Sequence, residues 1–93
     1  MKTTPAQFQA ARSSARLQGI TEGSMWQHYK GGVYVVDGFC IDTHDGLFKV
    51  LYSRVGGPNF SAKAEAGMSY SRVPEEWNEK VEDRRPRFLR LKD

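Results

Sequence analysis

The 93-residue chain has few of the residues on which many functional sites depend. Its single cysteine, Cys40, excludes an intramolecular disulfide. The two histidines, His28 and His44, stand far apart, and with Cys40 they show none of the close paired spacings of zinc sites. No apolar run reaches the roughly 18 residues that a membrane span needs, and no apolar stretch follows Lys2 to act as a secretory signal. We therefore expect a cytoplasmic protein without a metal or cofactor.

The residues that are present suffice for one small domain. Hydrophobic residues make up 39% of the sequence and aromatic residues 12%, which is enough to build a core. The net charge of +3 is mild for a dedicated nucleic-acid binder. Charges are grouped near the C-terminus, where a segment rich in glutamate and aspartate, residues 75–83, precedes Arg84, Arg85, Arg87, Arg90 and Lys92. These basic residues could hold phosphates, or they could pair with the neighbouring carboxylates.

The first segment of the chain predicts a helix. Thr4 and Pro5 are typical of a helix start, and Gly19 ends a run of good helix formers, so we expect a helix over residues 5–18. Its apolar face is thin, which favours a helix that lies on the domain surface or projects toward a partner. We therefore divide the chain into an N-terminal helical arm and linker, residues 1–24, and a β-rich domain, residues 25–93. We expect residues 1–22 to be dispensable for folding.

The rest of the chain predicts short strands. Residues 33–41 and 47–55 indicate a β-hairpin around the turn 42–46, and further strands are expected at 68–73 and 87–91. Pro74 favours a short helical turn between these last two strands, and the long loop 56–67 is either a lid or merely flexible. The pattern predicts a mainly β fold. It is either a small SH3-like barrel or a strongly bent antiparallel sheet, with a short helical turn and an added N-terminal helix.

Residues 26–36 read Trp-Gln-His-Tyr-Lys-Gly-Gly-Val-Tyr-Val-Val. This segment resembles the aromatic-x-His-Tyr-Lys-Gly-x-x-Tyr-x-Val motif that opens a family of small bacterial and phage domains, domain of unknown function 1653. The resemblance extends over about residues 26–90. Three features differ from the family pattern. Tyr70 stands where the family usually has tryptophan, and Pro74 comes one position after the expected proline. Residues 56–67 look like an insertion relative to the family. The resemblance implies a compact β-rich domain, and it implies no reaction.

The same segment supplies the candidate binding site. His28 and Lys30 are spaced to share one face of an extended chain, so they could together face an anion such as a phosphate. Aromatic residues elsewhere could form a stacking wall, although strand tyrosines are also typical core residues and His28 could simply fix a turn. The candidate ligand-binding residues are Trp26, His28, Tyr29, Lys30, Tyr52, Tyr70 and Arg72.

No group of residues indicates catalysis. Cys40 and His44 are the minimum for a thiolate nucleophile with a base, but Cys40 falls within an apolar strand, where a cysteine is typically buried, and His44 falls in a turn. Glu75, Glu76 and Glu79 are typical of a solvated helix face. We therefore expect no catalytic residue.

Three functions remain open. The first is a non-catalytic, phage-encoded module that recognises a small phosphorylated or nucleotide-like ligand through an aromatic and basic groove. The second is nucleic-acid binding through Arg84, Arg85, Arg87 and Arg90. The third is a protein-interaction or inhibitor module that docks through the N-terminal helix or an unpaired strand edge, with a second copy of the chain as one partner of the helix.

Overall fold

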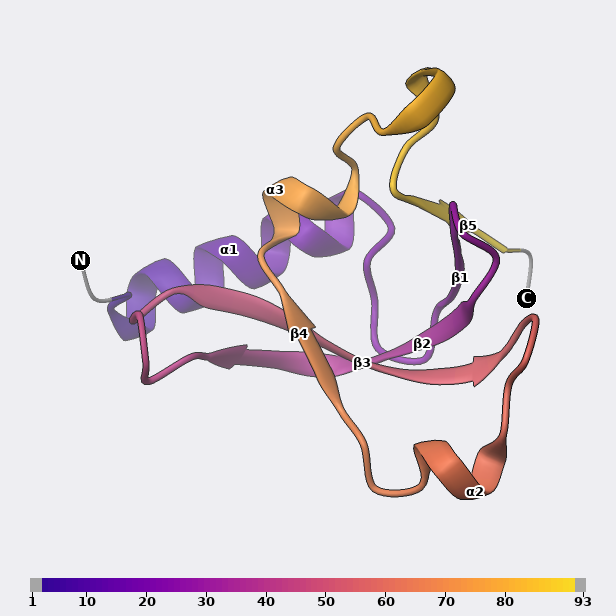
Figure 1. The fold of residues 1–93 in the computed structure, drawn as a ribbon. Helices are drawn as coiled ribbons and strands as arrows, with labels where there is room; N and C mark the ends of the chain where they lie inside the picture. Colours follow the sequence, from indigo (N-terminus) through magenta and orange to yellow (C-terminus); the bar gives the residue numbers. More distant parts are fainter. Residues whose placement is uncertain (1–2, 92–93) are drawn as a thin grey trace.

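A computed structural model describes residues 3–91 (Figure 1). The elements in chain order are α1 (Pro5–Leu17), β1 (Met25–His28), β2 (Val33–Ile41), β3 (Phe48–Gly56), α2 (Ala62–Glu65), β4 (Tyr70–Arg72), α3 (Pro74–Trp77), the 3-10 turn η1 (Glu82–Arg84) and β5 (Phe88–Arg90). The five strands form one antiparallel sheet in the order β4-β3-β2-β1-β5. The mainly β class is therefore confirmed. The sheet is not closed into a barrel, because its edge strands β4 and β5 do not pair with each other.

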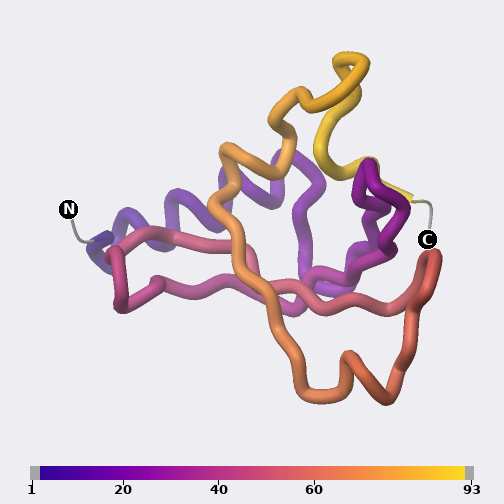
Figure 2. The backbone as a smooth tube through the Cα atoms, in the orientation of Figure 1, coloured from indigo at the N-terminus to yellow at the C-terminus, as the bar shows by residue number. Residues whose placement is uncertain are grey.

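The β2–β3 hairpin is the longest part of the sheet (Figure 2). Val36 lies opposite Tyr52, whereas Gly38 lies opposite Leu51, so Asp37 is an extra residue that forms a bulge. A bulge bends a strand and increases its twist. Beyond the bulge, Phe39 still lies on the core side of the sheet, where it packs against the buried residues.

Aromatic rings fill the core between the sheet and α3. Trp77 from α3 stacks on Phe88 from β5, with ring centroids 4.0 Å apart and planes 15° apart. The Trp77 ring also meets Trp26 edge-on at 5.6 Å and Tyr52 at 5.1 Å. Offset and edge-to-face contacts of this kind are the favoured arrangements of aromatic pairs. The core therefore joins β1, β3, β5 and α3 through a single aromatic cluster.

Helix α1 packs against this domain. Its start is capped by Thr4 and Gln7, which exchange hydrogen bonds with each other's backbone N–H. Ala15 and Ile20 are buried in the core cluster, and Phe8 meets Phe48 edge-on at 5.3 Å. The sequence placed residues 1–24 outside the domain and predicted that folding does not require residues 1–22. The burial of Ala15 and Ile20 revises that expectation, because these residues complete the core.

Besides η1, the structure adds two elements that the sequence did not indicate, β1 and α2. Strand β1 is only four residues long and includes polar Gln27 and His28, but it is held by pairing with β2 on one side and β5 on the other. Within the long loop, Ser61 caps the short helix α2. Tyr70 Oη donates to Glu65 Oε1 at 2.7 Å, and Arg54 donates to the carbonyls of Gly56 and Pro58. The loop is therefore tied to the sheet at both ends.

Candidate functional site

A pocket of about 300 Å³ opens where the turn after β1 meets the segment before β5. It is lined by Gln27, His28, Tyr29, Gly31, Arg85, Pro86 and Leu89. Two residues of the predicted His-Tyr-Lys site and one residue of the predicted basic segment therefore border the same hollow.

Strand pairing between β1 and β5 builds the floor of the pocket. Gln27 lies directly opposite Leu89, and the backbone N–H of Tyr29 donates to the carbonyl of Arg87 at 2.9 Å, which continues the pairing past the end of β1. Because side chains alternate along a strand, Gln27 and Tyr29 extend from the same face, opposite to that of Trp26. This face is open to solvent, and Leu89 is 60% exposed.

The turn after β1 brings three functional groups together. The rings of His28 and Tyr29 lie 4.6 Å apart, and Lys30 Nζ lies 5.7 Å from the Tyr29 ring centroid. His28 Nδ1 accepts a hydrogen bond from the Lys30 backbone N–H at 3.2 Å, so His28 also shapes the turn. Burial lowers the pKa of His28, and the positive charges of Arg72, Arg87 and Lys30 lower it further. An anion bound here would meet a cationic neighbourhood.

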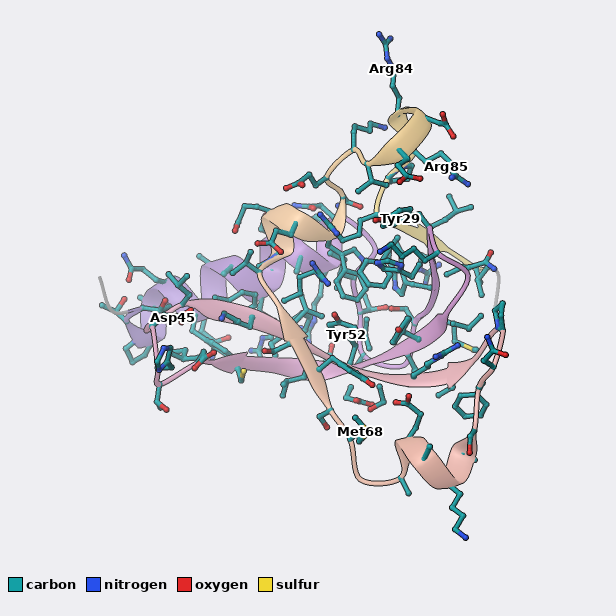
Figure 3. The ribbon with its side chains drawn as sticks, viewed as in Figure 1. Tyr29, Asp45, Tyr52, Met68, Arg84 and Arg85 are labelled. Atoms are coloured by element: carbon teal, nitrogen blue, oxygen red, sulfur yellow. The ribbon has the colours of Figure 1, made fainter. Side chains whose placement is uncertain are left out.

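A projecting hairpin supplies the opposite wall of the pocket. Lys80 pairs with Pro86, and the N–H of Val81 donates to the carbonyl of Arg85 at 2.7 Å. Figure 3 shows Arg84 pointing away from the molecule at the hairpin tip, whereas Arg85 lies lower, on the side of Tyr29. Arg85 is exposed, and its nearest carboxylate, that of Asp83, is 3.8 Å away and exposed as well. Such a pair is weak, which leaves the Arg85 guanidinium available to a ligand.

Glycines allow the turn after β1 to pack closely against the turn after β3. Gly57 has φ +98°, and a Cβ on it would lie 2.5 Å from the carbonyl oxygen of Gly31 and 2.8 Å from the Cα of Gly32. Any side chain at Gly57 would therefore displace the turn that carries Tyr29 and Lys30. Gly31 and Gly32 therefore serve for close packing between two turns.

Other predicted site residues lie elsewhere. Trp26 and Tyr52 are only 4% and 5% exposed and belong to the core, so they cannot stack on a ligand in this conformation. The Tyr70 hydroxyl donates a hydrogen bond to the Glu65 carboxylate. Arg72 donates to Tyr52 Oη at 3.3 Å and to Glu76 Oε1 at 3.0 Å. The predicted continuous groove is therefore divided into a core and a smaller pocket.

The predicted basic segment is divided in the same way. Arg87 donates to the carbonyl of Glu76 and to the carboxylate of Glu79, and its side chain is largely buried. Arg90 stands opposite Trp26, on the other face of β5 from Leu89. Arg84 and Arg85 remain exposed on the hairpin. The four arginines do not form one surface.

The residues around Cys40 form no nucleophile and base. Cys40 is half-buried rather than buried, and it lies opposite Lys49, on the sheet face away from Phe39. Burial and the nearby Asp42 carboxylate raise the pKa of the Cys40 thiol, which disfavours the reactive thiolate. Asp42 accepts hydrogen bonds from the His44 backbone and from Lys49. This hairpin end is held by structural contacts.

The sequence did not single out Gln27, Pro86 and Leu89 as site residues. The alternation of Gln27 with Tyr29 would have placed both on one face, but only if residues 25–28 had been recognised as a strand. Among residues 3–91, no three histidine, cysteine or acidic side chains are grouped so as to hold a metal ion. The same residues include no helix with the length and apolar character needed to cross a membrane.

Comparisons with protein-family models, with curated proteins and with solved structures found no match to this chain.

Proposed function

We propose that the protein is a non-catalytic binding module that holds a small phosphorylated, nucleotide-like ligand in the pocket between β1 and the projecting hairpin. The observation that carries the proposal is that Tyr29 and Arg85 border the same pocket. An aromatic ring and an exposed guanidinium suit a nucleotide, because one stacks on a base and the other binds a phosphate.

The lining of the pocket provides separate surfaces for the base and for the phosphate of a nucleotide. Tyr29, Pro86 and Leu89 offer apolar surface to a flat ring. Arg85 offers two parallel N–H donors to a phosphate, and exposed Lys30 adds a second positive charge beside Tyr29. A volume of about 300 Å³ is at the small end for ligand pockets, which favours a mononucleotide over a longer chain.

The test is calorimetric titration with adenosine 5′-monophosphate. We expect Arg85→Gln to weaken binding about tenfold or more, because a charge-assisted hydrogen bond contributes about 1.5–3 kcal/mol. Arg84→Gln is the matched control, since it removes the same charge from the neighbouring residue, which points away from the pocket. Equal losses in the two variants, or no binding by the unmodified protein, would contradict the proposal.

Nucleic-acid binding is the alternative, and the exposure of both Arg84 and Arg85 on one hairpin favours it. A single-stranded oligonucleotide is titrated at two salt concentrations to separate the two functions. Binding to the phosphate backbone weakens steeply with salt and would be lost in Arg84→Gln as well as in Arg85→Gln. Of these two arginines, pocket binding depends only on Arg85.

A further inference from the structure

The pocket floor carries a polar side chain that the proposed function does not use. Gln27 is exposed, lies opposite Leu89 and precedes Tyr29 by two residues on the same face. A base stacked on the Tyr29 ring would therefore have its edge near the Gln27 carboxamide.

The Gln27 carboxamide is set apart from the other glutamine side chains. Gln7 accepts from the Thr4 backbone, Gln9 accepts from Arg12, and Gln18 accepts from Asn78 at 2.9 Å. Within residues 3–91, the Gln27 carboxamide has no hydrogen-bond partner. Its acceptor oxygen and its two N–H donors all remain available to a ligand.

We infer that the pocket takes an adenine nucleotide and that Gln27 recognises the base, an inference that rests on the proposed function. Adenine presents the N6 donor beside the N7 acceptor, and a carboxamide pairs with both at once. Guanine presents two acceptors, O6 and N7, on the same edge, so the carboxamide oxygen would face an acceptor. A purine also offers more surface than a pyrimidine to Tyr29, Pro86 and Leu89.

The experiment compares the dissociation constants of adenosine and guanosine 5′-monophosphates, measured by calorimetry. We expect the unmodified protein to prefer the adenine nucleotide by about tenfold or more, within the range for a bidentate base contact. Gln27→Leu should bring the two affinities close together. Gln27→Glu should reduce the preference for the adenine nucleotide as well, because a carboxylate offers no N–H donor to the N7 atom of adenine. The ratio cancels the repulsion between the new charge and the phosphate, because both ligands carry the same phosphate.

Arg85→Gln is the control for this ratio, because it should weaken both nucleotides equally and leave the preference unchanged. If neither nucleotide binds, the proposed function itself fails. If both bind equally well, or if the preference persists in Gln27→Leu, the role of Gln27 is excluded while the pocket stands. Cytidine and uridine 5′-monophosphates complete the series, and a pyrimidine that binds as tightly as the adenine nucleotide would also overturn the inference.

Discussion

His28 lies between the core and the pocket. Its ring packs edge-on against Phe88 at 5.0 Å and against Tyr34 at 6.4 Å, while its Nδ1 atom holds the Lys30 backbone. Burial, followed by the charges of Arg72, Arg87 and Lys30, lowers the pKa of this imidazole in the folded protein. His28 is therefore uncharged at neutral pH, which suits a ring that packs against other aromatic rings.

The lowered pKa of His28 makes the fold sensitive to mild acid. The imidazole of the unfolded chain takes up a proton near pH 6.5, above the pKa of His28 in the folded state. His28 therefore adds no pH dependence above about pH 6.5, and stability falls as the pH drops from there through the folded pKa. We expect His28→Asn, which keeps an acceptor for the Lys30 N–H, to remove this dependence. Thermal unfolding between pH 8 and pH 5 measures it.

Asp42 and Asp45 do not confuse that measurement, because hydrogen bonds hold the pKa values of both carboxylates below the usual range. Asp42, for example, has its pKa lowered by hydrogen bonds from the His44 backbone and from Lys49. Equal slopes of melting temperature against pH in the unmodified protein and in His28→Asn would show that His28 is not the group responsible.

Among the elements, the hairpin over residues 79–87 holds an unfavourable turn. Asp83 and Arg84 have φ values of 58° and 59°, and the Arg85 N–H donates to the Glu82 carbonyl at 3.2 Å. Two successive positive φ values are typical of a type I′ turn, which favours Asn-Gly. A residue other than glycine loses roughly 1–2 kcal/mol in this conformation. The hairpin that bears Arg85 is therefore less stable than the same hairpin with glycine in its turn would be.

Arg84→Gly should raise the stability of the protein by about 1 kcal/mol, because glycine adopts positive φ without a steric cost. Urea unfolding measures the change, and Arg84→Ala is the control that removes the side chain but keeps the strain. Nucleotide binding should be unchanged in both variants, since Arg84 does not line the pocket. A gain of equal size in Arg84→Ala would assign the effect to the charge rather than to the backbone.

At the scale of the whole molecule, α1 and the sheet share one core. Ile20 is fully buried, and Asn78 Nδ2 donates to Gln18 Oε1, so the N-terminal segment is held by both apolar and polar contacts. We expect Ile20→Ala to cost about 2–4 kcal/mol, as for other buried isoleucines. Deletion of residues 1–22 should cost more and leave much of this small domain unfolded, as seen by circular dichroism and proton NMR. Leu17→Ala is the control, because Leu17 is 90% exposed and should be almost neutral.

The sequence predicted local structure better than the site. The turn residues 42–46 and the β-branched runs identified the hairpin, Thr4 and Pro5 identified α1, and Pro74 identified α3. The aromatic residues were harder to place, because an aromatic residue in a strand can either line a groove or fill the core. Trp26 and Tyr52 fill the core. The pocket joins residues about 60 positions apart through the pairing of β1 with β5, and neither its floor nor its far wall has a local pattern.

The contact between Gly57 and the Gly31–Gly32 turn limits how this chain can change by mutation. The two turns meet backbone to backbone, so a side chain gained at Gly57 requires a compensating shift around Gly31 and, with it, around Tyr29. A substitution at Gly57 therefore requires a change in the Gly31–Gly32 turn. Helix α2 is under no such steric restriction, since it buries no side chain. Substitutions at the exposed residues of α2 can therefore accumulate while the pocket keeps its shape.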